Sequence, residues 1–200
     1  MKIKWYGQGC FLINDKEAKA LLDPFDKSFE KKFNSDDVNF VLLPSEAFDY
    51  KHDLIFDWPG EYETKGIGVH GIDVKNENDK NNTIFVLSWG KVRICHLGKL
   101  DRILADNEIA LLGDVDILFL PVGDNDVLDS KKAHKVAESI DPRMIVPMYF
   151  NDGDSSDKFA PIDDFRREMG IKEDEESQSS LEISSLPEDQ TQIIILDKTE

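Results

Sequence analysis

An amphipathic helical pattern between two continuous apolar runs constrains the fold of this 200-residue chain most strongly. The runs, at residues 117–122 and 144–150, are typical of strands buried on both faces. Between them, the apolar residues from 133 to 140 recur at the spacing of one helix face, with Asp129 or Ser130 as the N-cap. A strand buried on both faces needs a layer on each side. We therefore expect sheets that are covered by helices.

The amino-terminal half alternates short apolar runs with turn residues, which is typical of β-strands. The predicted strands lie at residues 3–6, 11–13, 18–22, 40–43, 54–58, 67–72, 83–89 and 92–95. Further helices are predicted at 106–112 and 162–169, and exposed polar loops at 76–82 and 172–180. The chain is therefore expected to be an α/β protein with a single domain over residues 1–200.

The charge of the chain excludes several kinds of partner. It has 41 acidic and 24 basic residues, for a net charge of −17, and the basic residues are scattered. Such a surface repels phosphate backbones and anionic membranes, so we expect neither nucleic acid nor membrane as a partner. No signal peptide and no apolar run of about 20 residues is found, which favours a cytoplasmic protein. Cys10 and Cys95 cannot form a disulfide framework and are interpreted as buried hydrophobic residues.

Eight short blocks, taken in order, resemble one family. They are residues 2–13, 22–25, 59–63, 66–72, 82–85, 95–98, 118–123 and 145–148. Together they resemble the metallo-β-lactamase superfamily, and in particular its ascorbate-6-phosphate lactonase-like branch of small Zn-dependent hydrolases. The resemblance extends over nearly the whole chain, including a carboxyl-terminal strand at 192–196. It implies a four-layer αββα sandwich with a metal site at one edge of the two sheets.

The family's metal-binding signature is degenerate in this chain. The signature HxHxDH follows the strand at 40–43, and its four ligand positions correspond here to Ser45, Ala47, Asp49 and Tyr50. Only the aspartate is retained. Zinc in this family is held by imidazole and carboxylate groups, and an alanine has no lone pair to donate.

Two later ligand positions are changed as well. The bridging aspartate of the family is replaced by Lys99, and the histidine that follows Pro-Met is replaced by Tyr149. A lysine ammonium cannot coordinate a metal at neutral pH. The resemblance thus implies former metal-site positions without a dinuclear site. We assign no catalytic residue, no bound metal and no cofactor, although zinc is expected for the family.

Lys99 could compensate for the missing metal. We hypothesise that its ammonium pairs with Asp49, near Asp23, because carboxylates facing one another without a cation would be destabilising. The alternative is a solvated surface lysine.

The four histidines supply no matching ligand. His96 is expected to make a structural hydrogen bond, and His52 is either a displaced ligand or a loop residue. We expect His70 to be a surface or satisfied core residue and His134 to be exposed on its helix.

The leading hypothesis is a degenerate family member that has lost its zinc site and serves as a non-catalytic binding or scaffold protein. Its partner would be an unknown protein or small-molecule ligand, and the resemblance leaves a homo-oligomer open. The alternative is a metal-dependent hydrolase of a lactone or phosphoester. Its site would be completed by a partner, or remodelled around Asp49, His52 and Asp124.

Two local interpretations also stay open. Asp124 and Asp126 follow a predicted strand and either bind a hard cation or form a solvated turn. Tyr50, Tyr149 and Trp58 either form the aromatic walls of a ligand pocket or belong to the core.

Overall fold

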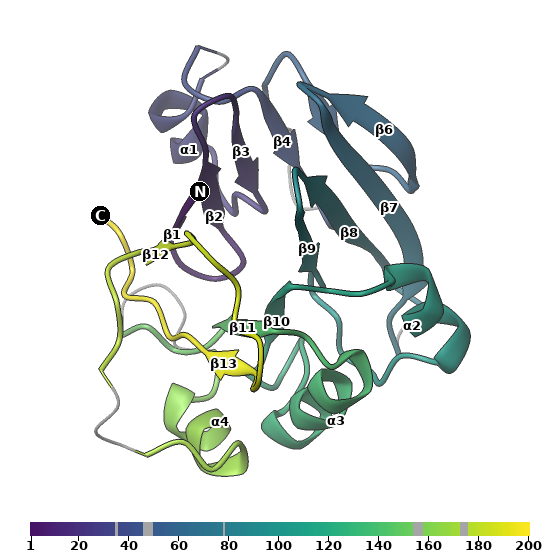
Figure 1. Cartoon of the computed structure of the whole chain (residues 1–200), viewed down its shortest axis with the longest axis vertical. Helices are drawn as coiled ribbons and strands as arrows, with labels where there is room; N and C mark the ends of the chain where they lie inside the picture. The colour runs from purple at the N-terminus through teal and green to yellow at the C-terminus, as the bar shows by residue number, and fades with distance from the viewer. Residues whose placement is uncertain (35, 46–49, 78, 154–157, 173–175) are drawn as a thin grey trace.

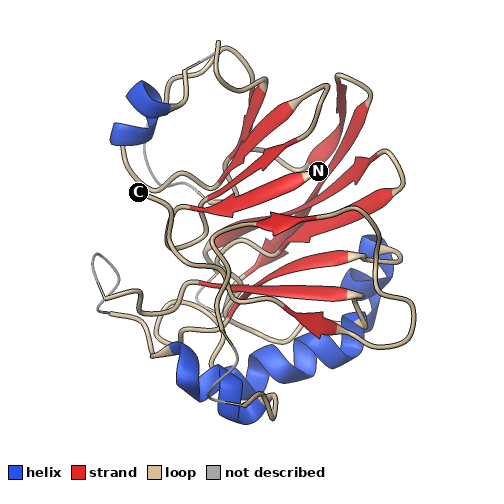
Figure 2. Cartoon of the chain, turned by 60° about the vertical axis from the view of Figure 1, so that its left-hand side comes forward, coloured by secondary structure: helices blue, strands red, loops and turns tan. Residues whose placement is uncertain are grey.

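A computed structural model describes residues 1–34, 36–45, 50–77, 79–153, 158–172 and 176–200 of the chain. Two β-sheets are stacked on one another, with helices on the outside of the stack (Figures 1 and 2). The predicted αββα arrangement is confirmed. In the described part of the chain, no helix is long and apolar enough to cross a membrane.

Over the described residues, the first sheet has six strands in the order β12-β1-β2-β3-β4-β5. Their bounds are β1 Lys2–Trp5, β2 Phe11–Asn14, β3 Lys19–Leu22, β4 Phe40–Leu42, β5 Ile55–Phe56 and β12 Leu181–Glu182. Neighbours from β12 to β3 are antiparallel, whereas β3, β4 and β5 are parallel.

The second sheet, in the part of the chain that the structure describes, has seven strands in the order β13-β11-β10-β9-β8-β7-β6. Their bounds are β6 Gly60–Thr64, β7 Ile67–Lys75, β8 Asn81–Trp89, β9 Val92–His96, β10 Ile117–Pro121, β11 Met144–Met148 and β13 Gln192–Ile193. The strands β9, β10, β11 and β13 are parallel, so their carboxyl ends meet at one edge of the sheet. The segments that follow β9, β10 and β11 therefore lie close together.

Helices cover the outer faces. The short α1 (Ser28–Lys32) packs Phe29 against buried residues of the first sheet, and α3 (Ser130–Ile140) packs on β10 of the second. The other helices among the described residues are α2 (Asp106–Leu112) and α4 (Ile162–Glu168). The side chain of Asp129 accepts the backbone N–H of Lys132 at 2.8 Å, which confirms Asp129 as the N-cap of α3.

The core lies between the sheets. Phe11 of β2 stacks on Phe119 of β10 with ring centroids 4.2 Å apart, and both side chains are fully buried. Contacts of this kind stabilise the stack through both apolar burial and ring geometry.

Three local differences from the predicted elements have physical causes. The edge strand β6 was not predicted, because its partly exposed residues do not form an apolar run. The strand predicted at 144–150 ends at Met148, since Tyr149 adopts a positive φ of 58°. The polar loop at 76–82 is not exposed throughout: Asn76 and Asn82 are buried.

Candidate functional site

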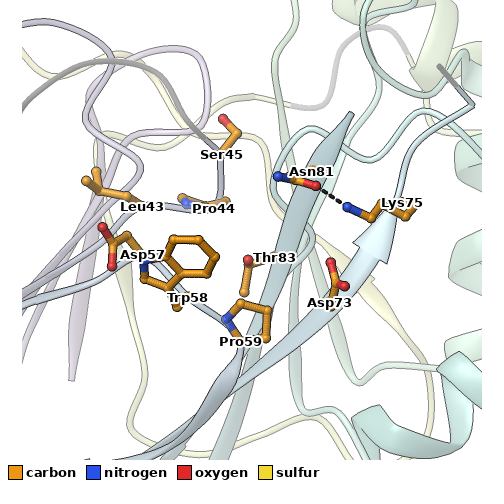
Figure 3. A pocket seen from close by; sticks show the side chains of 10 residues that line it. All are labelled: Leu43, Pro44, Ser45, Asp57, Trp58, Pro59, Asp73, Lys75, Asn81 and Thr83. Carbon is orange, nitrogen blue, oxygen red and sulfur yellow. Dashed lines mark hydrogen bonds between the residues drawn. The ribbon is translucent and has the colours of Figure 1, made fainter. Parts of the chain in front are cut away.

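Two adjoining pockets open beside the end of β4 and the turn after β9. The polar pocket, of about 530 Å³, is lined by residues that include Ser45, Asn76, Asn81, Lys99, Asp101 and Asp126. The tryptophan pocket, of about 730 Å³, is lined by residues that include Pro44, Asp57, Trp58, Pro59, Asp73 and Thr83 (Figure 3). Ser45 and Asn81 line both pockets, so the two are neighbours.

Two buried asparagines hold the backbone of Lys99. The Oδ1 atom of Asn82 accepts the Lys99 N–H at 2.8 Å, and its Nδ2 donates to the carbonyl of Leu97 at 3.0 Å. Asn76 Nδ2 donates to the Lys99 carbonyl at 2.7 Å. Gly98 has a φ of +61°, and a Cβ there would lie 2.3 Å from Asn82 Oδ1, so only glycine fits this turn. The turn therefore places Lys99 at a fixed point on the wall of the polar pocket.

The Lys99 side chain is half-buried. Its Nζ lies 6.0 Å from the centroid of the Tyr149 ring. The ion pairs formed within the described part of the chain do not include Lys99. Asp49 and Ala47 lie outside the described residues, so the Lys99–Asp49 pair stays a prediction.

Tyr149 is buried below this turn and contacts Asp23. Its hydroxyl donates a hydrogen bond to the Asp23 carboxylate, which is itself buried. Burial, and then the charge of Asp23, raises the pKa of Tyr149 well above its ordinary value, so the hydroxyl stays protonated. A Cβ on Gly9 would lie 2.2 Å from Asp23 Oδ2, so the backbone comes very close to this pair.

Of the other residues predicted for the site, Ser45 and Trp58 line a pocket, and Tyr50 lies in the core. Ser45 lies at the pocket, and its buried Oγ has no hydrogen-bond partner among the described residues. Tyr50 is buried in a cluster with Phe29 of α1, and its hydroxyl lies 3.4 Å from the Phe33 carbonyl. Of the predicted aromatic wall, Trp58 lines the tryptophan pocket, whereas Tyr50 and Tyr149 line neither of the two pockets described above.

The ring nitrogens of two histidines are engaged with the backbone. His96 is buried, its Nδ1 accepts the Gly98 N–H at 3.0 Å, and its Nε2 donates to the Gly9 carbonyl at 2.9 Å. The structural hydrogen bond predicted for His96 is confirmed. His52 contacts the carbonyl of Val38 at 3.2 Å through Nε2, and its Nδ1 accepts the N–H of Leu54 at 3.1 Å. Neither imidazole has a lone pair free for a metal.

The other two histidines and both cysteines do not line the polar pocket. His134 lies on α3 beside Glu168, and His70 lies on β7 opposite Glu61 of β6. Both cysteines are buried, as predicted, and burial raises their pKa values. Of the two acids after β10, Asp126 lines the polar pocket, with its carboxylate 3.4 Å from Lys158 Nζ.

Residues 2–149 match the family model of the beta-lactamase superfamily domain. The chain belongs to the beta-lactamase superfamily. A UPF0173 protein of Pyrococcus furiosus is 25% identical to it, with 84% of this chain and 90% of the relative covered. A UPF0173 metal-dependent hydrolase of Natranaerobius thermophilus is 23% identical, with 76% and 84% covered.

A solved structure gives the same fold. A Thermotoga maritima protein of the metallo-beta-lactamase superfamily, described as a candidate Zn-dependent hydrolase, superimposes on this superfamily member with a TM-score of 0.80. The two are 24% identical, and 98% of each chain is covered. The comparisons do not single out the ascorbate-6-phosphate lactonase-like branch.

These relatives correct the leading hypothesis from the sequence. A non-catalytic binding or scaffold protein was expected because the ligand positions are degenerate, and that expectation is wrong: the relatives carry the name metal-dependent hydrolase. A metal ion is likewise expected for the family, so the expectation of no cofactor is not supported.

The described residues do not fit a histidine-based metal site. Over the described ranges, no group of three histidine, cysteine, aspartate or glutamate side chains is placed to hold a metal ion. His96 lies shortly before Lys99 in the sequence. Both nitrogens of its ring are hydrogen bonded to backbone groups. The described residues therefore offer no place at which a metal ion would activate a water molecule.

Sequence reasoning missed the role of Asn76 and Asn82. Both were placed in an exposed polar loop, yet each satisfies a backbone group of the Lys99 turn. One signal was present for Asn82, since it begins one of the blocks that carried the family resemblance.

Proposed function

We propose that the protein is a hydrolase that acts in the polar pocket on a lactone or a phosphoester. The observation that carries this proposal is the fixed position of Lys99. Its backbone is held on both sides by buried asparagines, while its side chain lines an open polar pocket. The hydrolase names of the relatives support the same reaction class.

The chemistry of hydrolysis suits a fixed cation. Attack of water on a carbonyl or phosphoryl centre builds negative charge on an oxygen atom, and a preorganised cation stabilises that charge. The backbone of Lys99 is held by Asn76 and Asn82, and its side chain lines the pocket, so its ammonium can reach a bound substrate from a fixed backbone position. In our proposal the Lys99 ammonium faces the developing oxyanion.

A proton acceptor is available in the same pocket. The carboxylates of Asp101 and Asp126 both line it, and a carboxylate within reach of a bound water can take its proton. Asp101 is held in place because its Oδ1 accepts the backbone N–H of Glu77 at 2.9 Å. We assign Asp101 the role of base, since its carboxylate is the more firmly oriented of the two.

The test is turnover by the purified full chain. A lactone, an aryl carboxylic ester and an aryl phosphate are each assayed with Zn²⁺, Mn²⁺ or Mg²⁺ added, and after treatment with a chelator. We expect hydrolysis of the lactone or the phosphate. Lys99→Met keeps the length of the side chain and removes its charge, so kcat should fall by about 100-fold or more.

Lys91 provides the matched control. It is exposed in the turn between β8 and β9 and does not line the polar pocket. Lys91→Met should therefore leave kcat unchanged. Absence of turnover with every substrate and metal, or equal turnover by the Lys99 and Lys91 variants, would overturn the proposal.

A further inference from the structure

Trp58 is far more exposed to solvent than the other two tryptophans. Its exposed fraction is 66%, whereas Trp5 and Trp89 are 2% and 6% exposed. The ring lies in the wall of the tryptophan pocket, which extends over about 730 Å³ (Figure 3). Small-molecule pockets are lined mainly by apolar and aromatic side chains, so a tryptophan ring exposed in a pocket suits ligand binding.

The backbone around Trp58 is fixed although its ring is exposed. The Trp58 carbonyl accepts the hydroxyl of Tyr62 at 3.1 Å. It also packs so closely on β7 that a Cβ on Gly71 would lie 2.8 Å from it. The exposed ring is therefore presented by a well-held segment. Pro44 and Pro59 lie on either side of it and complete an apolar surface (Figure 3).

The charges around this ring are mainly negative. Asp57 and Asp73 are exposed and lie on opposite sides of Trp58 in Figure 3. The one cation among the described lining residues is Lys75, and its ammonium donates to Asn81 Oδ1 on the neighbouring strand. The pocket therefore combines an aromatic face with an excess of carboxylate.

We propose that the tryptophan pocket binds a small organic cation, an amine or quaternary ammonium compound with an apolar body. Its positive charge lies over the face of Trp58, and Asp57 and Asp73 add electrostatic attraction. An indole ring is the aromatic side chain that attracts cations best. The apolar part of the ligand contacts Pro44 and Pro59. The proposal is independent of hydrolysis, because it is tested by binding alone.

The test compares two probes of equal shape. Choline carries a quaternary ammonium group, and 3,3-dimethylbutan-1-ol has a carbon in place of the nitrogen, so the two differ in charge. Binding to the full chain is measured by ligand-observed NMR. Since Trp58 is the exposed tryptophan, protection of its fluorescence from acrylamide gives a second readout. We expect choline to bind at least fivefold more tightly than the neutral alcohol, and the difference to shrink at high salt.

Variants locate the site. Trp58→Ala should weaken choline binding at least fivefold, and Trp58→Phe should weaken it less because a ring is retained. The double variant Asp57→Asn with Asp73→Asn should weaken binding at least threefold. Asp114→Asn removes an exposed charge that lines neither pocket, and it should have no effect.

Three outcomes would overturn the proposal. They are equal binding of the two probes, choline binding that survives Trp58→Ala, and binding of a lysine-rich peptide without binding of choline. The last outcome would show a peptide surface in place of a small-molecule site. Circular dichroism of each variant checks that the fold is retained.

Discussion

Asn82 on β8 and Lys99 after β9 are joined by a hydrogen bond of 2.8 Å, from the Lys99 N–H to the asparagine Oδ1. Because Asn82 is 1% exposed, this bond is shielded from water. The same amide group donates to the carbonyl of Leu97. One buried side chain thereby satisfies both ends of the turn that carries the cation of the polar pocket.

Removal of this amide should destabilise the fold. Asn82→Ala leaves the Leu97 carbonyl and the Lys99 N–H without these partners, and each buried group left unsatisfied costs about 1–3 kcal/mol. We expect the free energy of unfolding in urea to fall by about 2–4 kcal/mol. Asn39→Ala is the matched control, because Asn39 makes a similar bond to the Lys19 N–H at an exposed position. Equal losses in the two variants would contradict the prediction.

Gly9 should not tolerate a methyl group. A Cβ there would lie 2.2 Å from Asp23 Oδ2 and 2.7 Å from the Tyr149 ring, and both neighbours are buried. Gly9→Ala should lower the free energy of unfolding by about 3 kcal/mol or more, since overpacked cores relax poorly. In Gly68→Ala the new Cβ would meet Ser88 at an ordinary 3.5 Å. Thermal denaturation should therefore give that variant a melting temperature close to that of the parent protein.

The Tyr149 hydroxyl should contribute measurably to stability. Tyr149→Phe removes the donor that faces the buried carboxylate of Asp23, and hydrogen bonds to charged groups contribute about 1.5–3 kcal/mol. We expect the free energy of unfolding, measured in urea, to fall by that amount. Tyr62→Phe removes a hydroxyl that donates a hydrogen bond to the Trp58 carbonyl at an exposed site. The free energy of unfolding should therefore fall by about 1 kcal/mol or less in this variant. A Tyr149→Phe variant as stable as the parent would argue against the bond.

His96 should make stability depend on pH below about 6.5. Burial lowers the pKa of His96 in the folded protein, although the charge of Asp23 and the bond to the Gly9 carbonyl oppose this effect. The unfolded chain therefore binds a proton more readily, and the free energy of unfolding should fall as pH decreases through the unfolded-state pKa of about 6.5.

The matched variant is His96→Gln, which cannot titrate in this range. Urea unfolding between pH 7 and pH 5 should give a positive slope of stability with pH in the parent, of at most about 1.4 kcal/mol per pH unit from this group. The slope should be smaller in the variant. Identical slopes would show that the imidazole of His96 is not held neutral by the fold.

Much of the fold could be predicted because its signals are local. The apolar runs at 117–122 and 144–150 and the helix behind Asp129 depend on neighbouring residues, and each appears close to its predicted place. The strand β6 and the helix α1 were missed, since short elements at the edge of the fold carry little periodic signal.

The site was less predictable, because its residues come from distant parts of the chain. The sequence drew attention to Lys99 and Tyr149 through a family pattern, but it could not show that Asn76 and Asn82 hold the lysine turn. Nor could it show that Asp23 accepts the hydrogen bond of the Tyr149 hydroxyl, 126 residues further along the chain. The degenerate ligand positions suggested a protein without catalysis, and the hydrolase names of the relatives contradict that interpretation.

The sequence by itself determined most of the secondary structure, the family and the absence of histidine at the family's ligand positions, because each is a property of residue identity and order. The tertiary structure decided which polar groups are buried together and which side chains line a pocket. The physical reason is that burial and hydrogen bonding join residues of different strands. Asn82 and Lys99 are brought together when β8 pairs with β9, whereas the pocket around Trp58 also needs Pro44 and Ser45, which follow β4 of the other sheet.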